Sequence, residues 1–188
     1  NFNIYYFILI GKVKYVIKNE ELKYYLLIVF VSIALIVMNI ASKYQSIWQC
    51  IRDVLFTVSS IITTTGYSTA DFGKWPLFSQ VILLLIMFFG ACAGSTAGGL
   101  KISRVIMMVK MYVAEIRQMI SPNRVITVKY EDKPLSAKMQ KNVAVYFVVY
   151  MILFTTMLLI VSFSLGDFMT AFSAVAATFN NIGPGLGK

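Results

Sequence analysis

Three long stretches of this chain contain no charged residue, and they restrict its fold more than any other feature. They cover residues 24–42, 75–100 and 142–166. A helix needs about 20 consecutive, mostly apolar residues to cross the hydrocarbon core of a bilayer, and each stretch is close to that length or longer. Only 13% of the residues are charged, against about a quarter in soluble domains. The sequence therefore predicts an all-α membrane protein.

The net charge of +9 is concentrated in the segments that flank these stretches. Lysine and arginine are dense in residues 1–23 and 101–141 and sparse in residues 43–53 and 71–74. Cytoplasmic flanks of membrane helices carry an excess of basic residues. We therefore place the two dense segments on the cytoplasmic side and the two sparse segments outside. The same placement argues against a nucleic-acid-binding protein, which is the other common explanation of a basic chain.

Two shorter uncharged stretches, residues 54–70 and 168–187, are rich in serine, threonine, alanine, glycine and asparagine. They are too polar for helices that face lipid. We expect a short helix in each, at Val54–Thr63 and Ala171–Phe179, followed by a glycine-containing turn. Irregular backbone at membrane depth is tolerated only where it is buried in protein or lines a water-filled cavity. Both turns are therefore candidate parts of a pore.

The first turn has the chemistry of a cation filter. Backbone carbonyls that face a common axis replace the hydration shell of a potassium ion in the T-V-G-Y-G segments of potassium channels. Residues 64–68, Thr-Thr-Gly-Tyr-Ser, match that segment at threonine, glycine and tyrosine. Glycine permits the positive φ that turns successive carbonyls one way, and the C-terminus of a preceding helix adds negative partial charge. We expect the ring of Tyr67 to pack behind this filter.

A repeat relates the two turns and the helices before them. Gly183 follows Gly66 by 117 residues, and the same offset places residues 25–48 on residues 142–165. Any two membrane helices align loosely, but the matched order of elements and the glycine in both turns favour a true repeat. The predicted organisation is the end of a preceding repeat with a cytoplasmic linker (1–23), a complete unit of span, pore helix, filter and broken span (24–110), a cytoplasmic connector (111–141), and a second unit truncated after its filter (142–188).

The third apolar stretch contains the small-residue run GACAGSTAGG at residues 90–99. Each glycine makes a helix less stable by about 1 kcal/mol relative to alanine, so we expect the span to break here. The run is close to the nucleotide-binding pattern G-x-x-x-x-G-K-[ST], but Leu100 displaces the lysine by one position and a membrane span, not a strand, precedes it. Close packing between helices is the other explanation of such a run.

Polar residues beside these motifs have local explanations. Asp53 and Asp167 are predicted to cap the two short helices. Asn180 is expected to cap or to hydrogen-bond within the second turn. Lys101 and Arg104 follow the small-residue run, and they either anchor the helix at the cytoplasmic interface or contact the run or a partner.

Three motifs together resemble one family: TTTGYS (63–68), FGACAGSTAGGLKISR (89–104) and FNNIGPGLG (179–187). They are similar to the Trk/Ktr/HKT superfamily of cation transporters, most closely to its bacterial TrkH/TrkG-type potassium-uptake subunits. The resemblance implies units of span, short pore helix, filter loop and span, arranged four to a polypeptide around a pseudo-fourfold pore. About one and a half of these units are then present here.

The resemblance assigns roles to individual residues. Potassium ions would bind at the backbone carbonyls of the two turns, and the small-residue run would be an intramembrane loop that obstructs the pore. The filter residues are Thr64, Thr65, Gly66, Tyr67, Asn181, Ile182 and Gly183, and the gate-loop residues are Gly90, Ala93, Gly94, Ser95, Thr96, Gly98 and Gly99.

The function predicted in this way is potassium uptake through a gated, channel-like pore. A sodium-permeable transporter of the same family is one alternative, although both visible filter glycines are retained where a serine is associated with sodium permeation. A non-conducting structural subunit is the other. The chain has no histidine and no carboxylate pair in its spans, so we do not expect an enzyme. No cofactor is expected in this chain, and the potassium ion is the substrate.

The resemblance also predicts the surroundings of the protein. It implies a multi-pass protein of the bacterial inner membrane and a homodimer of the full-length subunit. It further implies a cytosolic nucleotide-binding regulatory subunit of the TrkA/KtrA type. The basic connector lies on the side where such a subunit would bind, and the nucleotide would belong to that partner.

Overall fold

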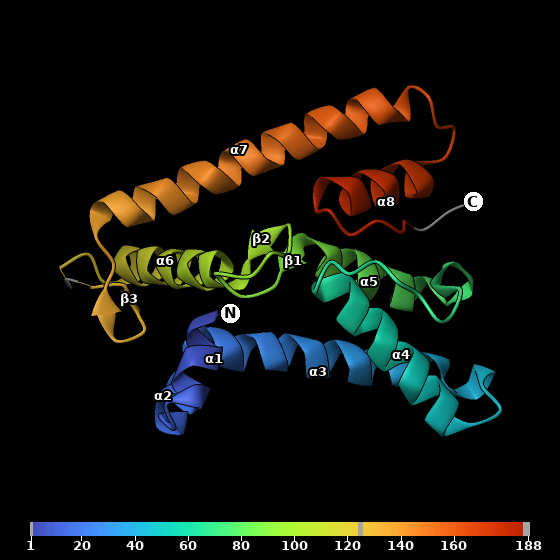
Figure 1. Ribbon diagram of the computed structural model, residues 1–188. Helices are drawn as coiled ribbons and strands as arrows, with labels where there is room; N and C mark the ends of the chain where they lie inside the picture. Colours follow the sequence, from blue (N-terminus) through green and yellow to red (C-terminus); the bar gives the residue numbers. More distant parts are fainter. Residues whose placement is uncertain (1, 124–125, 186–188) are drawn as a thin grey trace.

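The computed structural model describes residues 2–123 and 126–185, so the last two residues of the third motif, Leu186 and Gly187, lie outside the described residues. The chain is almost entirely helical, with two small pairs of strands (Figure 1). The helices are α1 (Phe2–Leu9), α2 (Val13–Lys18), α3 (Glu20–Ile40), α4 (Ile47–Ile62), α5 (Leu77–Phe88), α6 (Ile102–Ile120), α7 (Ala137–Ser162) and α8 (Phe168–Phe179), with 3-10 turns η1 (Ala41–Lys43) and η2 (Phe72–Lys74) and strands β1 (Phe89–Gly90), β2 (Leu100–Lys101), β3 (Lys129–Tyr130) and β4 (Lys133–Pro134).

Two helical segments in the described part of the chain are long and apolar enough to cross a membrane, Glu20–Lys43 and Ala137–Ser162. They correspond to the first and third uncharged stretches. The second stretch is not one helix, because α5 ends at Phe88 and helical structure resumes only at Ile102. Figure 1 shows α3 and α7 on either side of α5 and α6, with the break between these two helices in the middle of the molecule.

The first short helix is longer than the sequence suggested. Helix α4 begins at Ile47, not at Val54, because no glycine or proline interrupts the segment between them. The prediction that Asp53 caps this helix is therefore wrong. Asp53 lies within α4, where it is buried and its Oδ1 lies 3.3 Å from Nε of Arg52.

The second short helix, α8, begins at Phe168 and not at the predicted Ala171, directly after Asp167, as the capping role of Asp167 requires. One carboxylate oxygen of Asp167 accepts hydrogen bonds from the Thr170 backbone N–H (2.9 Å) and hydroxyl (2.8 Å). These bonds lower the pKa of the Asp167 carboxyl below its ordinary value. The predicted cap is confirmed, and its negative charge complements the N-terminal dipole of α8.

The expected polar connector, residues 111–141, is largely ordered. Helix α6 continues to Ile120, just before Pro122, and α7 begins already at Ala137. Between them β3 and β4 form an antiparallel hairpin whose two turn residues, Glu131 and Asp132, have φ of 50° and 62°. The last turns of α6, residues 115–120, are exposed throughout, and the described residues between α6 and α7 are turns and irregular backbone apart from the hairpin.

The hydrophobic core lies where α3, α4, α5 and α8 meet. Fully buried side chains there come from each of the first three helices, for example Ile36, Val58 and Leu83. Ile182, from the turn after α8, is 3% exposed and belongs to the same core. The core therefore reaches the second glycine-containing turn through Ile182 and the start of the helix break through Phe88 and Phe89.

Candidate functional site

The first turn follows α4 with a defined set of backbone hydrogen bonds. The N–H groups of Thr63, Thr64 and Thr65 donate to the carbonyls of Ser59 (3.0 Å), Ile61 (3.0 Å) and Ser60 (2.9 Å), respectively. Thr64 has φ 56° and Gly66 has φ 83°. The chain thus leaves the helix through a left-handed residue and takes a second positive φ two positions later.

The second turn repeats this path 117 residues later. The N–H groups of Asn180, Asn181 and Ile182 donate to the carbonyls of Ala176 (3.2 Å), Thr178 (3.1 Å) and Ala177 (2.8 Å). Asn181 has φ 57° and Gly183 has φ 108°. Each bond and each positive φ lies 117 residues after its counterpart in the first turn, so the two turns share one backbone conformation.

The two turns are in direct contact. A Cβ atom on Gly66 would overlap the carbonyl oxygen of Ile182 and would lie 3.3 Å from Cδ of Pro184. Only glycine permits both this approach and the positive φ. Gly183, by contrast, has open space around the position of a Cβ as far as the described residues are concerned. The predicted filter residues are therefore brought together, with Thr64, Thr65, Gly66 and Tyr67 in one turn and Asn181, Ile182 and Gly183 in the other.

The tyrosine of the first turn differs from expectation. The side chain of Tyr67 is 73% exposed, so its ring does not pack behind the turn in the described part of the chain. Its counterpart at the 117-residue offset is Pro184. The motif predicted the backbone conformation around Gly66 but not the environment of the ring.

The small-residue run forms a loop between α5 and α6. Strands β1 and β2 pair in parallel and close its two ends, with Phe89 opposite Leu100 and Gly90 opposite Lys101. A Cβ atom on Gly90 would overlap the carbonyl oxygen of Gly98. The two ends of the loop are thus held together by contacts that require glycine. The same glycines disfavour a helix, which explains why the helix breaks here.

The loop meets the second turn at Asn180. A Cβ atom on Gly98 would overlap the carbonyl oxygen of Asn180, and one on Gly99 would lie 3.2 Å from its side-chain Oδ1. Asn180 is fully buried. Its Oδ1 accepts from the Tyr150 hydroxyl (2.5 Å) and its Nδ2 donates to the carbonyl of Ala176 (2.8 Å). One asparagine therefore connects α7, α8 and the loop.

Lys101 folds back onto the loop. Its Nζ donates to the carbonyl (3.0 Å) and hydroxyl (3.2 Å) of Ser95 and to the carbonyl of Ala97. Arg104 instead stacks on α7, with its guanidinium carbon 3.9 Å from the ring centroid of Tyr146. The sequence left open whether these two residues anchor the helix at the interface or contact the small-residue run or a partner. Contact with the run is observed for Lys101 only. A phosphate-binding loop would direct its lysine toward the phosphate, so this geometry does not favour a nucleotide site.

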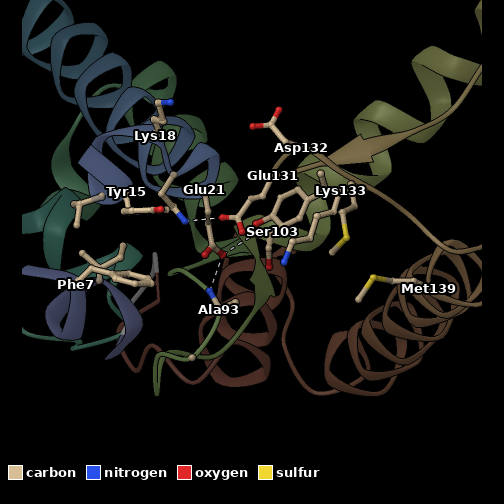
Figure 2. A pocket seen from close by; sticks show the side chains of 16 residues that line it. Phe7, Tyr15, Lys18, Glu21, Ala93, Ser103, Glu131, Asp132, Lys133 and Met139 are labelled. Carbon is tan, nitrogen blue, oxygen red and sulfur yellow. Dashed lines mark hydrogen bonds between the residues drawn. The ribbon is translucent and has the colours of Figure 1, made fainter. Parts of the chain in front are cut away.

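Glu21 is a residue that sequence reasoning missed. It lies in the first turn of α3 and is 2% exposed. Its Oε1 accepts from the backbone N–H of Ala93 (2.6 Å) and of Ser103 (3.2 Å), as the dashed lines in Figure 2 show. The signal in the sequence was a pair of glutamates directly before an apolar span, but that pattern is also typical of a helix N-terminus.

A cavity of about 770 Å³ adjoins Glu21 and the start of the loop. The β3–β4 hairpin forms part of its wall, and Figure 2 shows Glu131 and Asp132 on that side. Nδ2 of Asn19 donates to Oε1 of Glu131 at 2.6 Å. Burial raises the pKa of the Glu131 carboxyl, and the carboxylates of Glu21 and Glu20 raise it further.

Comparison with known proteins identifies the family. The model of the TrkH family, described as cation transport protein, matches residues 23–188. The chain belongs to the TrkH family. It is 35% identical to the Trk system potassium uptake protein TrkH of Escherichia coli K12 and 34% identical to TrkG of that organism, each over 191 residues that cover 100% of this chain and 39% of the relative. TrkH of Halomonas elongata is 39% identical over 149 residues, 79% of this chain and 31% of that protein.

The same family emerges from structure. The crystal structure of the potassium transporter TrkH from Vibrio parahaemolyticus matches with a TM-score of 0.90 at 34% identity, covering 100% of this chain and 41% of that chain. The TrkH-family chain thus spans about two fifths of the length of these relatives. The family resemblance, the all-helical fold and the membrane location expected from the sequence are confirmed. The relatives bear the names of transport proteins, in agreement with the expectation that this is not an enzyme.

The hydrogen bond between Tyr150 and Asn180 leads to a first prediction for the TrkH-family chain. Tyr150→Phe removes the donor to a fully buried acceptor, and we expect it to lower the free energy of unfolding of the complete protein by about 0.5–1 kcal/mol. Unfolding in mixed micelles measures this change. Tyr146→Phe is the matched control, because the Tyr146 hydroxyl has no hydrogen-bond partner among the described residues. An equal loss in both variants would contradict the prediction.

Proposed function

We propose that this chain is part of a potassium-uptake protein of the bacterial inner membrane and supplies two filter segments and the gate of its pore. The observation that carries the proposal is the pair of turns at Gly66 and Gly183, which have the same backbone hydrogen bonds and lie against one another. The family and the potassium-uptake names of the relatives support it.

In this proposal the two turns bind dehydrated potassium ions through backbone carbonyls. Helices α4 and α8 end at the turns, so their C-termini direct negative partial charge toward the same region. Positive φ at Thr64 and Gly66, and at Asn181 and Gly183, gives both segments the non-helical path that a carbonyl filter needs. The ion is the substrate, and no cofactor in this chain takes part.

The loop between α5 and α6 is the proposed gate. It meets the second turn at Asn180, where Gly98 approaches the backbone, and it is irregular backbone of the kind that membrane proteins place along water-filled paths. Its gate residues are those assigned from the family resemblance. Lys101 and Glu21 hold the loop through hydrogen bonds to Ser95 and Ala93.

Transport needs no chemical step in this mechanism. The membrane potential supplies about 2.3 kcal/mol per elementary charge per 100 mV, which drives cations toward a negative interior. The loop then decides whether the path is open. A homodimer and a cytosolic nucleotide-binding subunit complete the proposed assembly, with the basic segment 101–141 facing the subunit.

The experiment that tests the proposal is rubidium uptake into proteoliposomes by the complete protein, with potassium or sodium as competitor. We expect uptake that excess potassium suppresses and excess sodium does not. Equal suppression by sodium would favour the sodium-permeable alternative. Absence of uptake by folded protein, with and without the cytosolic fraction, would favour a non-conducting structural subunit.

A further inference from the structure

The buried carboxylate of Glu21 joins the two ends of the loop between α5 and α6. Ala93 lies near the start of that loop, and Ser103 is the second residue of α6, directly after it. A single atom, Oε1 of Glu21, accepts a hydrogen bond from the backbone N–H of each. Glu21 itself belongs to α3, a different helix, and only 2% of it is exposed.

We propose that Glu21 is a positioning residue that clamps this loop in its obstructing conformation. The inference rests on the proposed function and names a residue on which closure of the gate depends. Hydrogen bonds from N–H groups to a carboxylate are about twice as strong as those between neutral groups, and burial strengthens them further. The negative charge also lies at the N-terminus of α6, where the helix dipole stabilises it.

The geometry explains why one side chain can hold a loop of this length. Both N–H groups bond to the same oxygen, so the start of the loop and the start of α6 are held at a fixed distance from α3. Lys101 holds the middle of the loop through Ser95 and Ala97, and Gly98 rests against Asn180. A displacement of the loop that moves Ala93 away from Ser103 therefore has to break at least one bond to Glu21.

The end of α3 that carries Glu21 is itself fixed to the connector. Oε2 of Glu20 pairs with Nζ of Lys110 on α6 at 2.5 Å, and the same Nζ donates to the carbonyl of Lys129 on β3 at 3.0 Å. Nδ2 of Asn19 donates to Glu131 at the tip of the hairpin. The support that holds Glu21 in place thus comes from the cytoplasmic side of the loop.

The loop contains its own reporter for the test. Cys92 directly precedes Ala93 and is 6% exposed. In the complete protein, with every other cysteine replaced by serine, the rate at which a water-soluble methanethiosulfonate reagent modifies Cys92 measures release of the loop. Rubidium uptake into proteoliposomes measures opening of the pore, and competition by potassium and sodium measures the filter.

Three variants test the inference. Glu21→Ala removes the hydrogen-bond acceptor, and Glu21→Gln keeps an acceptor without its negative charge. Glu20→Gln removes the adjacent charge but no bond to the loop. For Glu21→Ala we expect about tenfold faster Cys92 modification and a several-fold rise in rubidium uptake, with the preference for potassium over sodium unchanged. Glu21→Gln should fall between Glu21→Ala and the unaltered protein. Glu20→Gln should accelerate Cys92 modification less than Glu21→Ala, because it weakens the support of α3 but removes no bond to the loop.

Three results would overturn the inference. One is an unchanged Cys92 rate in folded Glu21→Ala. Another is an equal acceleration in Glu20→Gln, which would show a general loosening of α3. The third is a lost potassium preference together with faster uptake, which would place the effect in the filter. If Glu21→Ala does not fold, the rate of Cys92 modification in Glu21→Gln alone decides whether Glu21 holds the loop. If the unaltered protein takes up no rubidium, the proposed function fails, while the Cys92 rates still report whether Glu21 holds the loop.

Discussion

Gly66→Ser is expected to abolish the preference of the complete protein for potassium over sodium and to lower rubidium uptake at least about tenfold. The residue has φ of 83°, and a non-glycine residue in such a conformation costs about 1–3 kcal/mol. Its Cβ would also overlap the carbonyl oxygen of Ile182 in the adjacent turn. Since that oxygen belongs to the proposed filter, the substitution displaces both turns at once, and carbonyls set for one ion size lose their spacing.

Two serine substitutions separate the causes of this effect. Gly183→Ser introduces the same strain at φ 108°, but no described residue lies within 4 Å of its Cβ position, so we expect a smaller loss of preference. Gly166→Ser has neither a positive φ nor a neighbour within 4 Å in the described part of the chain, and we expect unchanged uptake. In proteoliposome competition assays, the loss of potassium preference should decrease from Gly66→Ser through Gly183→Ser to Gly166→Ser. An unchanged ion preference in folded Gly66→Ser protein would remove this turn from the filter.

Gly98→Ala is expected to raise rubidium uptake by the complete protein about tenfold in the absence of any activating partner. The added Cβ would overlap the backbone carbonyl of Asn180, and a buried backbone atom cannot rotate away. Overpacking of this kind costs about 1–3 kcal/mol, and we expect the loop to relieve it by moving away from the turn. A cost of that size shifts a closed-to-open equilibrium by about 5- to 150-fold.

The initial rate of rubidium uptake measures this effect. Gly166→Ala serves as the control because its Cβ would have none of the described residues within 4 Å. Ion competition should be unchanged, since Asn180 precedes the carbonyls proposed to bind ions. Slower uptake by folded Gly98→Ala protein would mean that the contact between the loop and Asn180 supports conduction instead of opposing it.

Much of the fold follows from local properties of the sequence. The long uncharged stretches predicted the positions of α3 and α7, and the glycine-rich run predicted the break between Phe88 and Ile102. The 117-residue offset paired Gly66 with Gly183, and both have the positive φ that their surroundings suggested. These features were predictable because helix length, glycine and charge bias act over a few residues at a time.

Helix ends and side-chain environments were less predictable. Asp53 resembled a cap, but α4 already starts at Ile47, because no glycine or proline interrupts residues 47–53. The segment after Met111 resembled a polar connector, although α6 continues to Ile120. Tyr67 was expected to pack and is exposed. In each case the local sequence was compatible with more than one outcome, because intrinsic propensity alone does not fix where a helix ends or whether a ring is covered.

By itself, the sequence determined that this is a helical membrane protein with two matched turns and a broken span, because composition and backbone preference are local. Only the tertiary structure decided which atoms meet. Gly66 lies against Ile182, Gly98 against Asn180, and Glu21 accepts hydrogen bonds from residues 72 and 82 positions away. Such contacts depend on how separate helices pack. The role of a buried carboxylate, or of a glycine in close contact with another segment, can be recognised only when the residues that it contacts are known.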